Sequence, residues 1–106
     1  MIYSVKISEQ AEEDLKGIFE YIAFDLMSLQ NANAQLRRLE SNILKLKEMP
    51  ERFMAYDKEP WFSRGLRIMP VNNYLVFYIP DKLTKTVNII RVMYGGRDTE
   101  KQLNQN

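Results

Sequence analysis

Arginine, tyrosine and tryptophan side chains in the second half of the sequence carry the chemistry that this chain could perform. A guanidinium donates two parallel hydrogen bonds to a phosphate or a carboxylate, and an aromatic ring stacks on a nucleobase. These side chains lie on the predicted strands or beside them, and they are Trp61, Arg64, Arg67, Tyr74, Tyr78, Arg91 and Arg97. The set predicts a surface that binds a macromolecular partner.

The chain contains neither cysteine nor histidine, and this excludes several kinds of site. Disulfides, thiolate or imidazole zinc sites, and Ser-His-Asp or Cys-His catalysis all need one of these residues. The carboxylates show no clustered spacing of the kind that binds magnesium. We therefore expect no metal and no cofactor, and any catalysis must use arginine, lysine, tyrosine, aspartate or glutamate.

Length and composition predict a single soluble domain over residues 1–106. Apolar residues make up 45% of the chain and charged residues 27%, which is typical of a foldable globular protein. The net charge of +1 gives little bulk attraction to a polyanion, so a binding face must gather its own basic residues. No apolar run is long enough to cross a bilayer, and residues 1–6 do not resemble a signal peptide. We expect a cytoplasmic protein without a membrane partner.

The first half of the sequence predicts a strand followed by two helices. Residues 2–7 alternate like a strand, and Ser8 suits a helix N-cap. Apolar residues then recur at steps of three and four, first at Ala11, Leu15, Ile18, Ile22 and Leu26, and again at Leu29, Ala32, Leu36, Leu39, Ile43 and Leu46. Pro50 ends the second helix. Because almost nothing joins the two helices, they should form an antiparallel hairpin.

The second half predicts three strands, over residues 64–71, 74–79 and 86–94, separated by turns. A polar tail from about residue 98 is expected to fray. The order of strand, two helices and three strands predicts an α+β fold, with an antiparallel three-stranded meander and the helical hairpin on one face of the sheet.

Strand parity predicts which side chains lie on the sheet face that the helices leave open. An unpaired arginine is unfavourable in a core, so Arg67 and Arg91 are placed on the open face, with Tyr74 and Tyr78. Leu66, Ile68, Leu75, Phe77, Ile79, Ile90 and Val92 are placed in the core. Several apolar residues remain on the open face, which favours a partner-binding surface. The alternative is structural: the arginines pair with Glu51, Asp57 or Glu59, and the tyrosines pack across strands.

Tyr21 and Phe24 lie outside the main apolar stripe of the first helix. Most of the other extra apolar residues there are expected in the core, because a helix between a sheet and a second helix needs a wide apolar arc. These two are the ones we expect to meet another chain.

Three segments resemble the RelE/ParE family of toxins. They are MIYSVKISEQAEEDL at the N-terminus, RGLRIMPVNNYLVFY over Arg64–Tyr78, and RVMYGGRDTEKQL over Arg91–Leu103. With the helical hairpin, the resemblance spans nearly the whole chain. It implies the toxin of a bacterial type II toxin–antitoxin, or plasmid-stabilisation, module, with an antitoxin partner that binds and suppresses it. It makes Tyr21 and Phe24 candidate antitoxin contacts.

The resemblance leaves two targets open, because one fold serves both. Members similar to RelE are ribosome-dependent, metal-independent mRNA endoribonucleases, whereas members similar to ParE inhibit DNA gyrase. In the nuclease reading, Arg67 and Arg97 would hold the scissile phosphate and Tyr94 would donate a proton. The nucleases' middle-strand arginine, however, falls at Leu75, and another of their basic positions falls at Met69.

The ending RVMYGGRD is closer to ParE-type members. In that reading, Arg67, Arg91 and Arg97 are contacts to gyrase, together with Trp61, Arg64 and the two strand tyrosines. We therefore favour gyrase inhibition over mRNA cleavage. A third hypothesis is an interaction module without toxicity, derived from a degenerate toxin.

Overall fold

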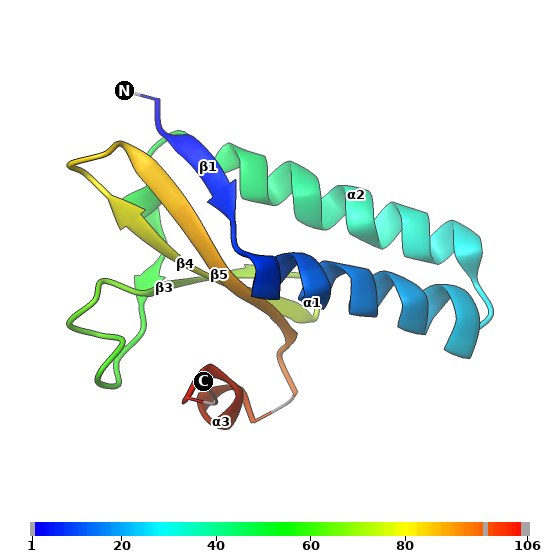
Figure 1. The fold of residues 1–106 in the computed structure, drawn as a ribbon. Coiled ribbons are helices and arrows are strands. Elements are labelled where there is room, and N and C mark those ends of the chain that lie inside the picture. Colours follow the sequence, from blue (N-terminus) through cyan, green and yellow to red (C-terminus); the bar gives the residue numbers. More distant parts are fainter. Residues whose placement is uncertain (1, 97, 105–106) are drawn as a thin grey trace.

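The computed structural model describes residues 2–96 and 98–104 and contains one mixed sheet with helices on both faces (Figure 1). Its elements in chain order are β1 (Ser4–Ile7), α1 (Glu9–Glu20), the π-helical turn η1 (Tyr21–Asp25), α2 (Leu29–Lys45), the 3-10 turn η2 (Pro50–Arg52), β2 (Met54–Ala55), β3 (Arg67–Val71), β4 (Tyr74–Asp81), β5 (Thr86–Tyr94) and α3 (Thr99–Asn104).

The five strands lie in the order β1-β5-β4-β3-β2. β1 pairs in parallel with β5, and the remaining neighbours are antiparallel. The predicted α+β fold is confirmed, including the N-terminal strand, the meander and the α1–α2 hairpin on one face. The hairpin extends beyond the end of the sheet, so its tip projects away from the body of the molecule (Figure 1).

Local sequence signals set the limits of the hairpin helices. The Ser8 hydroxyl accepts a hydrogen bond from the Ala11 amide at 3.0 Å and caps α1, whose first turn is acidic. The helix widens into η1, and Met27 then adopts a left-handed φ of 54° that reverses the chain before α2. Met49 repeats this conformation after α2, with a φ of 49° directly before Pro50.

The sheet face under the hairpin carries the larger apolar core. Leu39 and Ile43 of α2 and Ala11 and Leu15 of α1 are buried against it. The sheet contributes Val87, Ile89 and Val92 from β5, Val76 and Tyr78 from β4, and Met69 and Val71 from β3.

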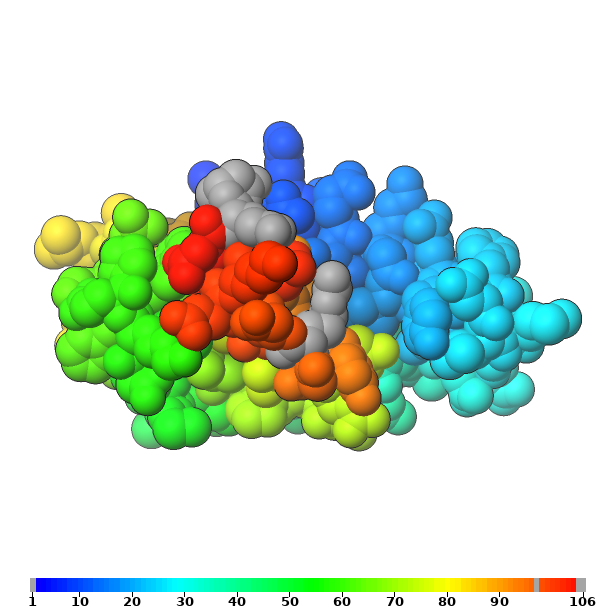
Figure 2. Space-filling view, turned by 90° about the horizontal axis from the view of Figure 1, so that it is seen from below, coloured from blue at the N-terminus to red at the C-terminus, as the bar shows by residue number. Residues whose placement is uncertain are grey.

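The opposite face of the sheet is also covered, by α3 and by the segment of residues 56–66. Leu103 is 5% exposed and packs in a second cluster with Tyr56, Leu66, Phe77 and Met93. The prediction of a fraying tail is therefore wrong for residues 99–104, because one buried leucine anchors a short helix there. Figure 2 shows this C-terminal segment, in orange and red, lying over the middle of that face.

The predicted faces of the strands are wrong at several positions. Val76 and Tyr78 lie in the core under the hairpin, whereas Leu75, Phe77, Ile79, Leu66 and Ile68 belong to the α3 side. Two causes account for this. Both faces are apolar, so polarity does not distinguish them, and a β-bulge leaves Ile90 without an opposite residue, since Phe77 pairs with Arg91 and Tyr78 with Ile89.

Candidate functional site

Arg67 and Tyr78 face each other across β3 and β4 on the hairpin side of the sheet, and both bind backbone carbonyls. The Arg67 guanidinium donates to the carbonyl oxygens of Glu51 at 3.0 Å and Phe53 at 2.6 Å. The buried Tyr78 hydroxyl donates to the carbonyl of Pro50 at 2.6 Å. The expectation that these side chains lie on an open face is wrong, since they attach the segment after α2 to the sheet.

Burial of Tyr78 raises the pKa of its phenol to about 12 from the ordinary value of 10.0. The folded state therefore holds this proton more tightly than the unfolded state does. This stabilising contribution is fully present below pH 10 and is lost as the pH rises toward 12. A Tyr78→Phe variant should lose about 1 kcal/mol at neutral pH, since the Pro50 carbonyl loses its donor. Urea unfolding between pH 8 and 11.5 should also show a weaker alkaline decline in stability than in the wild type; an identical decline would contradict this assignment.

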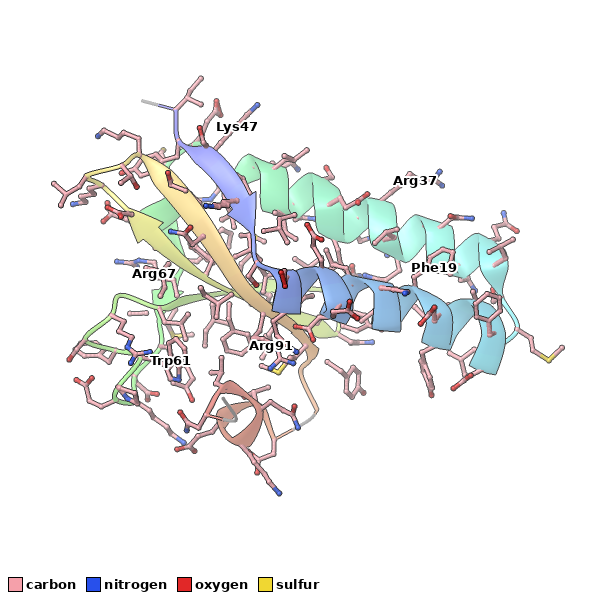
Figure 3. The ribbon with its side chains drawn as sticks, viewed as in Figure 1. Phe19, Arg37, Lys47, Trp61, Arg67 and Arg91 are labelled. Atoms are coloured by element: carbon pink, nitrogen blue, oxygen red, sulfur yellow. The ribbon has the colours of Figure 1, made fainter. Side chains whose placement is uncertain are left out.

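Arg91 lies on the α3 side of β5, as predicted, but it is not open. Its Nε and Nη2 atoms donate to the Asp14 carboxylate of α1 at 2.7 and 2.9 Å, and both side chains are 11% exposed. A third nitrogen, Nη1, donates to the Gln102 carbonyl of α3 at 3.3 Å. The hydrogen bonds that the guanidinium donates to Asp14 also raise its pKa. Figure 3 shows Arg91 between α1 and α3; its role as an exposed contact is thus corrected to that of a strut.

Side chains of α1 and its N-cap also form hydrogen bonds with the backbone of β5, beyond the point where β1 ends. The Asp14 carboxylate accepts from the Val92 amide at 2.9 Å, and the Ser8 hydroxyl donates to the Ile90 carbonyl at 3.0 Å. Asp14 was not among the predicted carboxylate partners, because it lies 77 residues from Arg91 in the sequence.

Trp61 and Arg64 lie at the surface, where the 56–66 segment meets α3. The Arg64 guanidinium lies 4.9 Å from the centre of the Trp61 ring, and the indole nitrogen donates to the Asn104 side chain at 3.1 Å. Phe62 beside them is 54% exposed. We call Trp61, Phe62, Arg64 and α3 the loop–α3 surface; in Figure 3 Trp61 lies at the side of this surface away from the hairpin tip.

Three tyrosines converge on a groove between α1 and the ends of β4 and β5. Tyr21, Tyr74 and Tyr94 line a cavity of about 900 Å³, and the rings of Tyr74 and Tyr94 meet edge to face at 6.0 Å. Partial burial is the main cause that raises the pKa of Tyr74. The remaining walls of the cavity come from α1, η1, α2 and the strand ends. They include Glu13, Asp14, Gly17, Ile18, Ile22, Leu26, Asn31, Gln35, Asn73, Val92 and Met93. We call this the hairpin groove.

The tip of the hairpin continues the groove with exposed apolar side chains. Tyr21 is 53% exposed and Phe24 66%, and Met27 at the turn is 87% exposed. Tyr21 and Phe24 were predicted from the sequence to meet another chain, but the groove beside them was not predicted, because its walls come from five separate elements. The sequence signal that could have indicated it is Gly17, a glycine inside a helix.

Of the three residues proposed for RNA cleavage, the two that the structure describes, Arg67 and Tyr94, lie apart on the sheet. Arg67 pairs with Tyr78 in the middle of β4, whereas Tyr94 pairs with Tyr74, the first residue of that strand. Tyr74 and Tyr78 are four steps apart along the strand, which is about 13 Å. The third residue, Arg97, lies outside the described residues.

Over residues 2–96 and 98–104, no three acidic residues lie close enough to hold a metal ion. No helix in the same ranges has the length and apolar character that a membrane span needs.

A family model described as "ParE toxin of type II toxin-antitoxin system, parDE" matches residues 5–99. Comparison with curated protein sequences gives no significant match.

Solved structures of toxin–antitoxin systems share this fold. The chromosomal ParDE system of P. aeruginosa contains a chain with a TM-score of 0.71 and 17% identity, over 88% of this chain and 96% of that chain. The RelBE2 complex of Mycobacterium tuberculosis gives 0.66 and 21%, over 89% and 92%. A mutant of the E. coli toxin RelE in the free state gives 0.67 and 13%, over 96% and 93%.

Proposed function

Because the chain belongs to the ParE toxin family of type II toxin–antitoxin systems, we propose that it is a toxin that arrests growth by binding DNA gyrase. It acts in the cytoplasm and needs no metal or cofactor. The gyrase assignment follows the ParE branch of the family and rests on the arrangement of the arginines and tyrosines.

The proposal is supported by the placement of the residues that RNA cleavage would use. Arg67 and Tyr94 lie apart, and the Arg67 guanidinium is already bound to backbone carbonyls. RNA cleavage needs a base, a cation and an acid around a single phosphate, each within hydrogen-bond reach of its atom. Here Arg67 binds the carbonyls of Glu51 and Phe53 beside the middle of β4, and Tyr94 lies in the hairpin groove beside the first residue of that strand. An inhibitor that acts by binding needs no such convergence, so the arrangement favours gyrase inhibition over nuclease activity.

The loop–α3 surface is the part of the molecule that we assign to gyrase. Aromatic and arginine side chains are the types that dominate binding energy at protein interfaces. Arg64, Trp61 and Phe62 offer both kinds within four consecutive residues, on the side opposite the hairpin. Of the other predicted contacts, Arg91 supports this surface through the hydrogen bond that it donates to the Gln102 carbonyl of α3, whereas Arg67, Tyr74 and Tyr78 lie on the hairpin side of the sheet.

An antitoxin is the second partner in this proposal. The mycobacterial RelBE2 structure is a toxin–antitoxin complex, which supports a cognate antitoxin here. Tyr21 and Phe24 provide an exposed apolar surface that an antitoxin would cover. We expect this antitoxin to be a short chain encoded beside the toxin.

Induced expression in a bacterial host tests the proposal. Growth should stop, cells should form filaments with an induced DNA-damage response, and co-expression of the adjacent short chain should restore growth. A Trp61→Ala variant should weaken gyrase binding by at least about tenfold, as loss of a central aromatic contact does. Lys47→Ala, at an exposed position in the turn that follows α2, is the control and should remain toxic.

Two other outcomes would decide against the proposal. Immediate arrest of translation with mRNA cut within codons would identify a RelE-like endonuclease. Normal growth under strong expression would identify a non-toxic interaction module.

A further inference from the structure

The two helices of the hairpin carry charges of opposite sign. α1 has five acidic residues and one lysine, whereas α2 has three basic residues and one glutamate. A solvated helix usually mixes both signs on one face, because oppositely charged side chains three or four residues apart stabilise each other. Here the signs are separated instead, which leaves α2 with a positive charge from Arg37, Arg38 and Lys45.

The three basic side chains of α2 lie on its outer side. Leu39 is buried under the helix, whereas Arg37, Arg38, Ser41 and Lys45 are exposed and, at about 3.6 residues per turn, fall on the opposite half of the helix. Figure 3 shows Arg37 on the side of α2 away from α1. We call Arg37, Arg38, Ser41 and Lys45 the α2 basic face.

The cations of this face are not neutralised by the chain itself. Over residues 2–96 and 98–104, none of the three forms an ion pair. The Arg38 guanidinium donates one hydrogen bond to the Gln35 side chain at 3.1 Å, and its other N–H groups remain available. The acid of the helix, Glu40, lines a cavity toward α1 together with Glu12 and Leu15. The α2 basic face therefore presents positive charge to a partner.

The spacing of the α2 basic face matches the phosphate backbone of a duplex. Arg37 and Lys45 are eight residues apart, which is about 12 Å along the helix axis. One strand of duplex DNA carries a phosphate at about every 3.4 Å of its axis, so this face spans about three or four phosphates. Arginine binds phosphate oxygens through two parallel hydrogen bonds, and the small Ser41 between the cations lets the helix approach closely.

The composition of α2 favours a duplex over a single strand. Proteins that bind single-stranded nucleic acid stack the bases on aromatic rings. α2 contains no aromatic residue. Arginine, lysine and serine side chains contact phosphates, and such contacts carry no sequence information. The partner is therefore recognised by the charge of its backbone.

The surface that we assign to gyrase lies on the other side of the molecule. The loop–α3 surface covers the sheet face opposite the hairpin, and in Figure 3 Trp61 lies below the sheet whereas Arg37 lies above α2. Both surfaces can therefore be occupied at the same time. Because gyrase acts on DNA, a toxin that is bound to the enzyme has duplex DNA nearby.

We propose that the α2 basic face binds the phosphate backbone of duplex DNA, so that the toxin contacts gyrase on one side and the DNA held by gyrase on the other. This inference rests on the proposed function and adds a second partner to it. Two contacts with one complex reinforce each other, since the first raises the effective concentration for the second. The toxin should therefore bind gyrase more tightly when DNA is present.

Fluorescence anisotropy with a short labelled DNA duplex tests the α2 basic face by itself. Each phosphate contact contributes about 0.9 to the slope of log affinity against log salt, so three contacts predict a slope of about −2.7 and a loss of about fortyfold from about 50 to 200 mM salt. Arg38→Gln should reduce the steepness of this slope by about 1. The triple variant Arg37→Gln/Arg38→Gln/Lys45→Gln should weaken binding at low salt by at least about tenfold.

Lys16→Gln is the matched control for these substitutions. It removes the same charge from an exposed position of the hairpin, but Lys16 lies on α1 with Glu12, Glu13 and Glu20 three or four residues away. Its affinity and salt slope should equal those of the wild type. Glutamine is about as good a helix former as arginine or lysine, so circular dichroism should show the same helix content in every variant.

Binding to purified gyrase with and without DNA tests the simultaneous contact. The wild type should bind gyrase at least about tenfold more tightly when plasmid DNA is present. The triple variant should match the wild type on gyrase alone, because its loop–α3 surface is intact, but it should lose this gain.

The possible outcomes separate this inference from the proposed function. Duplex binding that falls in the triple variant but not in Lys16→Gln, together with the gain on gyrase, supports the inference. A wild type that inhibits gyrase but does not bind the duplex overturns it and leaves the proposed function standing. A wild type that does not bind gyrase overturns both. Tighter binding to ribosomal RNA, or to vesicles of phosphatidylglycerol, than to the duplex would assign the face to another polyanion and also overturns the inference.

Discussion

An Asp14→Ala variant is expected to lose about 3–5 kcal/mol of unfolding free energy, because it leaves the Arg91 guanidinium unpaired in a largely buried site. The Asp14 carboxylate accepts three hydrogen bonds, two from Arg91 and one from the Val92 amide. A domain of this size has only about 5–15 kcal/mol in total. The change would therefore remove a large part of its stability.

Urea unfolding of purified variants measures this effect. Glu13→Ala is the matched control, because Glu13 precedes Asp14 on α1 but is exposed and forms no ion pair with a described residue. It should change stability by less than about 0.5 kcal/mol. The double variant Asp14→Ala/Arg91→Leu should recover part of the loss, since it removes the unpaired charge. A loss below about 1 kcal/mol for Asp14→Ala would show that the pair does not connect α1 to the sheet as described.

A Leu103→Asp variant is expected to release α3 from the sheet. Leu103 is the buried side chain of this short helix, and burying a leucine contributes about 1.5–3 kcal/mol. A carboxylate cannot take its place beside Phe77 and Met93 without a large desolvation penalty. The helix should therefore detach and expose the second apolar cluster.

Trp61 reports this release, because it is the only tryptophan and its indole nitrogen donates to Asn104 of α3. Its fluorescence should shift to longer wavelength in Leu103→Asp, and the amides of α3 should lose hydrogen-exchange protection. Lys101→Asp introduces the same residue at an exposed position of the helix and should leave the spectrum unchanged. An unshifted spectrum in Leu103→Asp would contradict the docking of α3 through this leucine.

The helices and strands could be predicted from the sequence because their signals are local. The three- and four-residue spacing of apolar side chains gave the hairpin, and Ser8 and Pro50 marked its ends. The last strand was placed at residues 86–94, as the structure has it. The two-residue strand β2 and the short helix α3 were missed, because neither is long enough to show a period.

The faces of the strands could not be predicted, because the information lies in the tertiary structure. Both sides of β4 are apolar, so Tyr78 and Phe77 are equally plausible core residues until the covering elements are known. The bulge at Ile90 changes the alternation within β5 without any mark in the sequence. Arg91 was placed on the correct side, but its partner Asp14 comes from a helix far away in the chain.

The candidate site could likewise be predicted only where its signals are local in the sequence. Tyr21 and Phe24 were identified as exposed because they fall outside the apolar stripe of α1. The hairpin groove could not be predicted, because Tyr74 and Tyr94 are brought to it only by the pairing of β4 with β5. The separation of Arg67 from Tyr94 likewise appears only once the register is known.

Incubation of the purified chain with DNA gyrase and relaxed plasmid tests most directly whether it acts by binding rather than by cleavage. Supercoiling should be inhibited by the wild type and by Tyr94→Phe alike, and mRNA on programmed ribosomes should stay intact. Unimpaired supercoiling together with cleaved ribosomal mRNA, and loss of that cleavage in Tyr94→Phe, would contradict the assignment.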